Sequence, residues 1–472
     1  MKRYWRTSNP LRVWISADYL WCGGSERWTT VLANAFAERG DDVAVHCSLG
    51  VEGQFVGDLD ERVELLGKPN MADSVAQALS LLPDARPDLY IVNNSIPGLL
   101  AAQMVRYAVG HVGVLVHSAS TWYATFIEQQ RQVDCFFAVS QDIQRWLVEE
   151  NGVDEDKVIL LENLIDTEAF QPPSRKQQAA ARYSRLAKIM PVDDGNFVFG
   201  YVGRISHEKG PHLIVKAFKE VHNQYPHARL VLVGGLDKRA VAGETVQTYK
   251  DWTSEEIDLL RTAIAEVDPK GTCIHWTGGA VDDVTPWYHL MDTLVFASKF
   301  EGLPLAALEA MASGVPIIIP DVGSCGLLVR KPNGFSHSSG VLYQAGQSNE
   351  LPDQVDLTDA MLDMVESEYL HRGLAARVLV QQEYSQQEFM GDYLETLTQG
   401  LLSRNAFEGE VKKNLQSKVC IQHDGEPEST AIARAVADHL FNEHDVTVTT
   451  GGEVGAADVV CRIQMKGDDN AT

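Results

Sequence analysis

The segment that decides the fold is EGLPLAALEAMASGVPIII, residues 301–319, in which two glutamates interrupt an apolar run. The residues before it, DTLVFAS at 292–298, are rich in apolar side chains and predict a buried strand. Gly302 and Pro304 then break the regular pattern. We therefore expect Glu301 in a loop at the carboxyl end of this strand, where open parallel sheets bind their ligands.

The residues after this loop predict a helix from about Leu305 to Ala312 that ends near Gly314. Proline is tolerated in the first turn of a helix, and glycine is common just beyond the last turn. The helix is apolar nearly all round, which is typical of a buried helix. Glu309 lies inside it and needs a partner, because an unpaired buried charge is costly. The free N–H groups at the helix start form an anion site.

Short apolar runs alternate with helical or loop segments along most of the chain. This alternation is typical of βαβ units in a parallel sheet, and it restarts in the second half. We therefore predict an α/β protein with two parallel sheets in tandem and a ligand-binding cleft between them. The predicted strands are residues 12–17, 42–48, 89–94, 112–118, 134–140 and 157–163 in the first half, and 197–204, 228–235, 272–279, 292–298 and 315–321 in the second.

Changes in composition divide the chain into five parts. A proline pair, a basic stretch and a polar turn separate the two α/β halves. The last part reads strand, helix, strand and a further strand, and we expect a small βαβ extension of unknown role. The predicted parts are a Rossmann-like domain at 1–165, a linker at 166–195, a second Rossmann-like domain at 196–383, a helix at 384–404 and the extension at 405–472.

The formal net charge of −25 over 472 residues argues against nucleic-acid binding, because there is no excess of cations to neutralise a phosphate backbone. Seven scattered cysteines without C-x-x-C spacing fit reduced thiols, not a disulfide framework or a zinc site. No apolar run reaches the ~18–20 residues of a membrane span, and the N-terminus lacks the apolar segment of a secretory signal. We therefore expect a cytoplasmic protein.

One basic stretch stands out in this acidic chain. It could touch a phosphorylated acceptor or an anionic membrane surface, which would place the protein at the inner face of the membrane. The alternative, which we favour, is a solvated surface helix, because its apolar residues are mostly Ala and Leu. The cations are Arg175, Lys176, Arg182, Arg185 and Lys188.

A second pair of cations follows a predicted strand in GYVGRISHEKG, residues 200–210. Arg204 and Lys209 lie in the loop at the carboxyl end of this strand, between Gly203 and Gly210. The two side chains could clamp a phosphate group, with arginine as a fork and lysine as a point charge. The alternative is a pair of exposed loop cations.

These segments together resemble the C-terminal domain of the retaining nucleotide-sugar glycosyltransferases of family four, or group 1 glycosyltransferases, which have the GT-B fold. The similar segments are GYVGRISHEKGPHLIVKAF (200–218), LVLVGG (230–235) and WYHLMDTLVFASKFEGLPLAALEAMASGVPII (287–318). They contain the Arg–Lys pair and the E-x7-E pair that are motifs of this family. The resemblance implies that the second domain binds the nucleotide sugar.

The N-terminal half resembles the family less specifically. CGGSER (22–27) is similar to its N-terminal Gly-Gly loop, and LLENLIDTEAF (160–170) to its interdomain segment. The likeness covers roughly residues 11–400. It implies that the first domain binds the acceptor and that the helix at 384–404 crosses back to it.

The resemblance implies a nucleoside-diphosphate sugar as donor, with its hexosyl group transferred to an acceptor hydroxyl with retention of configuration. The acceptor would be a glycan, a lipid-linked compound or a small molecule, and neither a cofactor nor a metal is expected. Arg204 and Lys209 would hold the diphosphate as leaving group. Glu301 would bind hydroxyls of the sugar, and Glu309 those of the ribose.

Other residues would approach the donor on the same grounds. His117 ends the strand VGVLVHS, where the family often has an active-site histidine; the alternative is a strand-end histidine with satisfied polar groups. The remaining residues implied near the donor are Gly23, Gly24, Gly203, Gly234, Gly279, Gly302, Leu303, Pro304 and Leu305.

The sequence departs from the family pattern at several positions. Ala297 replaces a proline, VGSCGLLV at 322–329 lacks an acidic residue, and Glu162 and Leu164 replace a proline and a glycine. These changes concern the acceptor and the hinge. D-x-D occurs only at 58–60 and 154–156, neither at a strand end suited to a donor metal, which agrees with a metal-independent family.

Two other classes of function compete with transfer as interpretations of these motifs. One is a sugar-nucleotide epimerase or hydrolase on the same fold, since a fold alone does not fix a reaction. The other is a nucleotide-sugar-binding subunit without activity, which would show loss of the motif residues. All four of Arg204, Lys209, Glu301 and Glu309 are present, and their pairing favours transfer.

Overall fold

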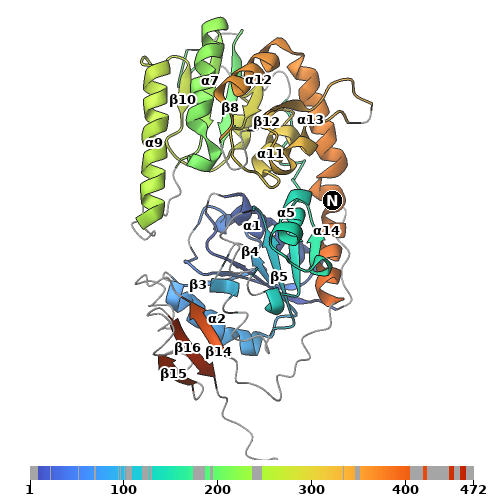
Figure 1. The fold of residues 1–472 in the computed structure, drawn as a ribbon. Helices are drawn as coiled ribbons and strands as arrows, with labels where there is room; N and C mark the ends of the chain where they lie inside the picture. The colour runs from blue at the N-terminus through green and yellow to red at the C-terminus, as the bar shows by residue number, and fades with distance from the viewer. Residues whose placement is uncertain are drawn as a thin grey trace, which may run out of the picture.

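The computed structural model consists of two α/β domains and a small separate sheet near the C-terminus (Figure 1). The residues that it describes are 9–21, 23–51, 53–68, 71–93, 95, 97–99, 101, 109–119, 127, 130–173, 187–191, 195–235, 247–332, 334–345, 351–403, 418–422, 446–450 and 458–463.

The first domain is built on seven parallel strands in the order β3-β2-β1-β4-β5-β6-β7. Strands β4, β5 and β6 are buried along their whole length, as expected where helices cover both faces of a parallel sheet. Six of the strands were predicted, and β3 was not. The strands are β1 Arg12–Ala17, β2 Asp42–Cys47, β3 Glu64–Gly67, β4 Leu89–Asn93, β5 His111–Val116, β6 Cys135–Ala138 and β7 Val158–Leu160.

Helices α1 and α14 pack on one face of this sheet, and α2 and α5 on the other. Helix α1 begins at Gly24, and Gly23 precedes its first turn. The helix ends at Arg39, and Gly40 follows it with a φ of 104°, a conformation that favours glycine. The helical segments are α1 Gly24–Arg39, η1 Val56–Asp58, α2 Met71–Ala85, η4 Gln130–Gln132, α5 Gln141–Arg145, η5 Trp146–Glu150 and η6 Glu155–Lys157.

The second domain repeats this plan with six parallel strands in the order β10-β9-β8-β11-β12-β13. Five strands were predicted, and the edge strand β13 was not. Its strands are β8 Phe197–Val202, β9 Ala228–Val233, β10 Ile274–Trp276, β11 Thr293–Val295, β12 Ile317–Pro320 and β13 Gly340–Tyr343. Its helical segments are η8 His207–Lys209, α7 Pro211–Gln224, α9 Gln247–Val267, α10 Thr285–Tyr288, α11 Leu305–Ala312, η9 Gly323–Leu328, α12 Gln354–Glu366 and α13 Tyr369–Glu383.

Helix α11 has the bounds predicted from the sequence, residues 305–312. It stops because Gly314 adopts a φ of 77°, and its N–H donates to the carbonyl of Met311. The N–H of Val315 donates to the carbonyl of Ala310, which completes a Schellman motif. Glu301 lies in the loop between β11 and α11, as expected.

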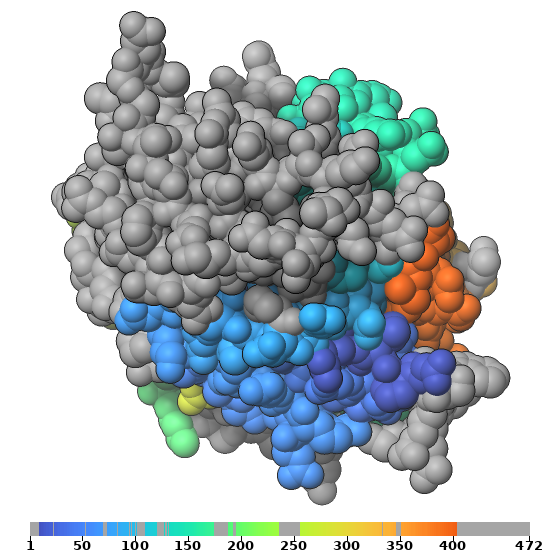
Figure 2. Space-filling view, turned by 90° about the horizontal axis from the view of Figure 1, so that it is seen from below, coloured from blue at the N-terminus to red at the C-terminus, as the bar shows by residue number. Residues whose placement is uncertain are grey.

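Helix α14, Gln386–Leu402, leaves the second domain and packs along the first (Figures 1 and 2). Its start is tied to the interdomain segment, because the N–H of Ile165 donates to the carbonyl of Tyr384 over 2.7 Å. Further along, Trp28 Nε1 donates to the hydroxyl of Tyr393 over 3.1 Å, and both side chains are buried. The first contact fixes the start of the helix to the interdomain segment, and the second fixes its middle to α1.

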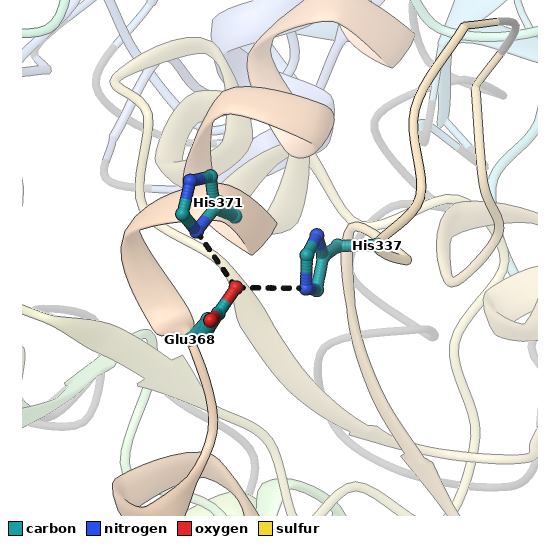
Figure 3. Close-up of side chains that lie close together, drawn as sticks. All are labelled: His337, Glu368 and His371. Carbon is teal, nitrogen blue, oxygen red and sulfur yellow. Dashed lines mark ion pairs between the residues drawn. The ribbon is translucent and has the colours of Figure 1, made fainter.

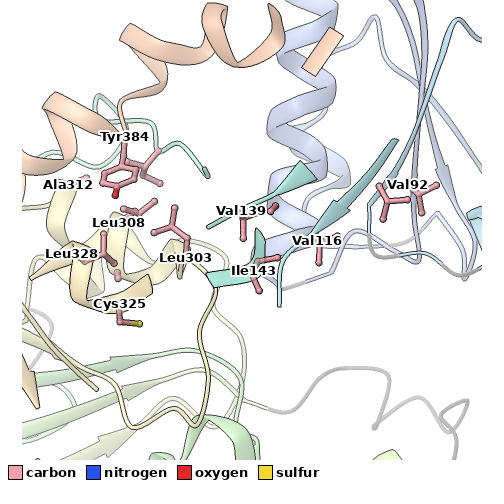
Figure 4. Packing of buried hydrophobic residues seen from close by; sticks show 14 of the residues in the cluster. Val92, Val116, Val139, Ile143, Leu303, Leu308, Ala312, Cys325, Leu328 and Tyr384 are labelled. Atoms are coloured by element: carbon pink, nitrogen blue, oxygen red, sulfur yellow. The ribbon is translucent and has the colours of Figure 1, made fainter. Parts of the chain in front are cut away.

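Apolar packing continues from one domain into the other (Figure 4). Val139 and Ile143 of the first domain and Leu303 and Leu308 of the second belong to one buried cluster. All four side chains are at most 4% exposed. The domains therefore meet through a shared apolar contact near the start of α11, Leu305–Ala312.

The C-terminal extension forms a three-stranded sheet from β14 Lys418–Gln422, β15 Val446–Thr450 and β16 Asp458–Ile463. The three predicted strands are present, but β14 and β15 are not neighbours as in a plain βαβ unit. Strand β16 lies between them and is antiparallel to both. The predicted helix between β14 and β15 lies outside the described residues.

Most of the basic stretch at 175–188 also lies outside the described residues; Lys188 is described, in a turn. Within the described part of the chain, no helix has the length and apolar character needed to cross a membrane.

Candidate functional site

Loops at the carboxyl ends of strands from the two domains meet in the space between the sheets. A Cβ atom on Gly302 would lie 2.3 Å from the carbonyl oxygen of His117 and 3.3 Å from Cγ2 of Val139. A Cβ atom on Gly24 would lie 3.6 Å from Cδ1 of Leu305. Glycine at position 302 thus allows the loop before α11 to reach the end of β5.

Lys209 and Glu301 form the most direct pair in this region. Lys209 Nζ lies 2.6 Å from Oε1 of Glu301, and the same oxygen accepts a hydrogen bond of 2.6 Å from Ser298 Oγ. Glu301 is only 6% exposed. A buried carboxylate is stable here because it is both paired and hydrogen-bonded. The structure therefore brings together a cation and a carboxylate from two predicted motifs.

Arg204 is held on the same loop as Lys209. Its carbonyl accepts a hydrogen bond from the buried hydroxyl of Tyr201, and burial raises the pKa of Tyr201. The loop closes at Gly210, where φ is 56° and a Cβ atom would lie 2.7 Å from the carbonyl oxygen of Ala297. This contact packs the cation-bearing loop against the carboxyl end of β11.

Three predicted glycines belong to adjoining loops of the second domain. Gly234 has a φ of 137°, and a Cβ atom on it would lie 1.9 Å from the carbonyl oxygen of Gly203. Thr277 links this turn to the next loop, because its Oγ1 accepts from the N–H of Gly234 and donates to the carbonyl of Gly279. Around Gly279, a Cβ atom would meet no heavy atom within 4 Å.

Glu309 has partners from both domains, which confirms that this buried carboxylate needs them. Tyr288 donates its hydroxyl to Oε2 over 2.7 Å, and Arg27 Nη1 donates to Oε1 over 3.2 Å. Burial raises the pKa of Glu309, although Arg27 and the hydrogen bond from Tyr288 act in the opposite direction. The guanidinium of Arg27 lies 5.7 Å from the ring centre of Phe55 and 5.2 Å from that of Phe170.

His117 is half-buried at the end of β5. Its Nε2 lies 2.7 Å from Oδ1 of Asn93. The amide nitrogen of Asn93 donates to the carbonyl of Ser25 and to Thr29 Oγ1, which leaves Oδ1 as the acceptor for His117. Burial lowers the pKa of His117 to about 4. The imidazole is therefore neutral at pH 7, with its proton on Nε2.

The Gly-Gly loop lies at the start of α1, in the first domain. Gly23 is extended, with a φ of −138°, and Gly24 is the first residue of the helix. The contact of Gly24 with Leu305 brings this loop to the first turn of α11. Leu303 is buried, and Pro304 and Leu305 are partly buried beside it. The predicted donor-binding segments of both domains thus lie close together.

Five residues that form contacts in this site were not predicted from the sequence. Asn163 is one of them: its amide donates to the carbonyl of Leu303 over 3.0 Å and ties the interdomain segment to the loop before α11. The sequence position of two of them could have indicated a role in the site. Arg27 ends the CGGSER segment, and Ser298 lies three residues before Glu301. The missed residues are Arg27, Asn93, Asn163, Tyr288 and Ser298.

The segment that departs from the family pattern forms η9 beside Glu301. Gly323 has a φ of 50°, and a Cβ atom on it would lie 2.0 Å from the carbonyl oxygen of Glu301. Ser324 Oγ donates to Asp142 of the first domain over 2.7 Å. A carboxylate of the first domain therefore contacts this segment. The two D-x-D pairs, 58–60 and 154–156, precede β3 and β7 and lie at the amino ends of strands.

Comparisons with known proteins agree with this architecture. A family model described as Glycosyl transferases group 1 matches residues 196–364, and one described as Glycosyltransferase Family 4 matches residues 22–169. A lipopolysaccharide core biosynthesis mannosyltransferase of Rhizobium meliloti, LpsB, is 29% identical over 42% of this chain. A capsular polysaccharide biosynthesis glycosyltransferase of Staphylococcus aureus, CapM, is 24% identical over 53% of it. The matches span 49% and 64% of those relatives' own lengths.

Solved structures show the same fold. Anabaena Alr3699/HepE, in complex with UDP and glucose, superposes with a TM-score of 0.64 at 18% identity. The superposition covers 82% of this chain and 99% of the other. The two parallel-sheet domains thus have the GT-B architecture that the sequence predicts.

Proposed function

Because this chain belongs to the group 1 glycosyltransferases of family four, we propose that it moves a hexosyl group from a nucleoside-diphosphate sugar to an acceptor hydroxyl with retention of configuration. The observation that carries the proposal is the Lys209–Glu301 pair with Ser298, which lies where the loops of the two domains meet. The bond that breaks joins the diphosphate to the sugar. A cation at this point can bind the diphosphate, and a carboxylate can bind the hydroxyls of the sugar.

In this mechanism Arg204 and Lys209 hold the diphosphate. Negative charge on its leaving oxygen grows as the glycosyl bond breaks, so their attraction is stronger in the transition state than in the ground state. In the structure, Lys209 is paired with Glu301. When the donor binds, its diphosphate would replace Glu301 as a partner of Lys209. Glu301 would then accept hydrogen bonds from hydroxyls of the sugar.

Glu309 would bind the hydroxyls of the ribose. A carboxylate can accept about four hydrogen bonds, and Tyr288 and Arg27 provide two. The nucleotide can therefore bind without removal of either partner. Gly23, Gly24 and the backbone of Gly302, Leu303 and Leu305 would face the phosphates and the sugar.

His117 would act near the sugar as a neutral hydrogen-bonding group. Asn93 orients its ring and fixes the proton on Nε2. The contact between the two domains at Gly302 would exclude water, which competes with the acceptor hydroxyl for the sugar. We propose no metal at the donor site, since the cations of the protein neutralise the diphosphate.

The printed names of the relatives define the range of substrates to test. Alr3699/HepE was solved with UDP and glucose, LpsB is a mannosyltransferase of lipopolysaccharide core biosynthesis, and CapM belongs to capsular polysaccharide biosynthesis. We propose a hexose nucleotide as donor and a glycan or glycolipid as acceptor, with the reaction in the cytoplasm. The presence of a membrane-bound acceptor would draw the protein to the inner membrane face.

The test is a thermal-shift screen of UDP-, GDP-, ADP- and dTDP-sugars, followed by NMR of the product. A donor at ~100 times its dissociation constant stabilises the protein by ~2.7 kcal/mol, so one nucleotide class should raise the melting temperature clearly above the others. The anomeric proton of the product should show the configuration of the donor. A product of inverted configuration contradicts retention, and no shift with any nucleotide sugar contradicts the donor class.

A further inference from the structure

Three potential metal ligands of the second domain lie close together (Figure 3). Nε2 of His337 lies 3.1 Å, and Nδ1 of His371 3.0 Å, from the same oxygen, Oε2 of Glu368. One ligand atom of each residue lies within 4.8 Å of the other two. His337 precedes the first residue of β13, so the cluster lies at the amino end of this strand, whereas the donor loops lie at the carboxyl ends.

We propose that His337, Glu368 and His371 bind a zinc ion, with two imidazole nitrogens and one carboxylate oxygen as ligands and water in the fourth position. Two histidines and one carboxylate are a ligand set that suits Zn²⁺. Bonds of ~2.0–2.1 Å in a tetrahedron place neighbouring ligand atoms ~3.3 Å apart. The two separations from Oε2, 3.0 and 3.1 Å, are close to this value.

The ligands come from two segments that other contacts already hold together. Arg372 Nη1 donates to Ser338 Oγ over 2.6 Å and to the carbonyl of Gly340 over 2.7 Å, so it joins the start of α13 to the loop that carries His337. The cluster is thus positioned by a residue that is not itself a ligand. Glu368 directly precedes α13, and His371 is in its first turn.

A neighbouring serine orients one of the imidazoles. Nδ1 of His337 lies 2.9 Å from Ser336 Oγ. When Nδ1 carries the proton and donates it to this hydroxyl, Nε2 presents its lone pair toward Glu368. Ligating histidines commonly have such a partner on the other ring nitrogen. The two rings are nearly parallel, at 17°, and both present a nitrogen to the same carboxylate oxygen.

The same geometry has an explanation without a metal. Glu368 could accept hydrogen bonds from the two imidazoles, and all three side chains reach solvent. The two explanations differ in stoichiometry and in dependence on the ligands. Only a zinc site saturates with one ion per chain and loses affinity when either histidine is removed. An ion at this position would tie residues 334–339 to α13 and stabilise the second domain.

The experiment uses the full chain, stripped with a chelator and titrated with Zn²⁺ by calorimetry. The variants are His337→Ala, His371→Ala and the double variant, with circular dichroism to verify their folding. The matched control is His227→Ala, which removes an exposed histidine of the same domain. We expect one zinc ion per wild-type or control chain, and an affinity at least ~10-fold lower in each single variant.

Thermal melting gives a second readout that does not depend on the heat of binding. Zinc should raise the melting temperature of the wild type and of His227→Ala by a few degrees, and should not raise that of the double variant. Absence of one-to-one binding in the wild type overturns the proposal, as does equal affinity in the wild type and the double variant.

Discussion

At the scale of single residues, Lys209 is a proposed diphosphate-binding cation with a buried carboxylate as its partner. It lies 2.6 Å from Glu301, which also accepts from Ser298. Lys209→Met keeps the aliphatic stem and removes the charge. If Lys209 stabilises the leaving diphosphate, kcat should fall by about 10²–10³, the usual effect of removing one group that stabilises developing charge. Steady-state kinetics with the donor found by thermal shift measures this effect.

The control for this change is Lys219→Met, on the exposed face of α7. It removes the same charge from the same domain and should change kcat less than twofold. A Lys209→Met enzyme with a raised KM and an unchanged kcat would contradict the role in leaving-group stabilisation, because uniform binding affects KM alone.

His117 predicts an acid dependence of stability. Its pKa is about 4 in the folded protein, against 6.5 for an ordinary histidine. The unfolded chain therefore takes up the proton first, and stability falls as the pH decreases from 6.5 to 4. When the pH is lowered from 7.5 to 5.0, the protonation of this residue should decrease the free energy of unfolding by about 2 kcal/mol. His117→Gln should remove that part of the loss, as measured by urea unfolding at both pH values.

The matched control is His227→Gln, which replaces an exposed histidine and should leave the pH dependence as in the wild type. Buried His46, whose pKa is also lowered by burial, contributes equally to wild type and variants. Identical pH dependences of the wild type and His117→Gln would show that the folded state does not depress the pKa of His117.

At the scale of elements, the loop before α11 is positioned by the absence of a side chain at residue 302. An alanine Cβ there would lie 2.3 Å from the carbonyl oxygen of His117, a backbone atom that cannot move by itself. Gly302→Ala should therefore displace this loop or separate the domains. We expect a loss of stability of about 1–3 kcal/mol, as for overpacked sites, and a fall in kcat/KM of at least ~10².

Gly391→Ala is the control for this substitution. Gly391 lies in α14, and a Cβ atom there meets no heavy atom within 4 Å. Alanine in the helix should be neutral or stabilise the protein by up to ~1 kcal/mol. Wild-type activity in Gly302→Ala would show that the two domains do not need this close approach.

The elements also show which parts of the structure the sequence could predict. The bounds of α11 followed from local rules, since Pro304 and Gly314 mark its ends. Strands β3 and β13 have only four residues each, which is the lower limit for recognising a strand from its apolar pattern. The roles of Arg27 and Asn93 could not be predicted for a different reason. Their partners, Glu309 and His117, are 282 and 24 residues away, and no local pattern encodes such contacts.

At the scale of the whole molecule, the two sheets hold the predicted motifs in one region because both present the carboxyl ends of their strands to it. Gly24 and His117 come from the first domain, and Leu305 and Gly302 come from the second. The arrangement of motifs could therefore be predicted from the fold class. The polar contacts that join the domains could not, because they depend on how the domains are rotated relative to each other.

The ion pair between Arg27 and Glu309 joins the two domains, and its contribution to the free energy of unfolding can be measured. Arg27→Met removes the partner from a carboxylate that is 5% exposed, and should cost about 1–3 kcal/mol of stability. Glu309→Gln leaves an amide that still accepts from Tyr288, and it should cost less. Because the proposed ribose contact needs the carboxylate, Glu309→Gln should also weaken donor binding by about 10-fold or more.

A double-mutant cycle isolates the coupling of the two domains at this point. The Arg27→Met and Glu309→Gln effects on unfolding free energy should be non-additive by about 1 kcal/mol or more, since the pair is partly buried. The matched cycle uses Arg261→Met and Asp258→Asn, an exposed pair within α9 of the second domain, which should show no measurable coupling. Additive effects for Arg27 and Glu309 would mean that this ion pair does not couple the two domains. Nonadditivity that grows when donor is present would instead show that the nucleotide binds with Arg27 still paired to Glu309, as the free acceptor positions of this carboxylate allow.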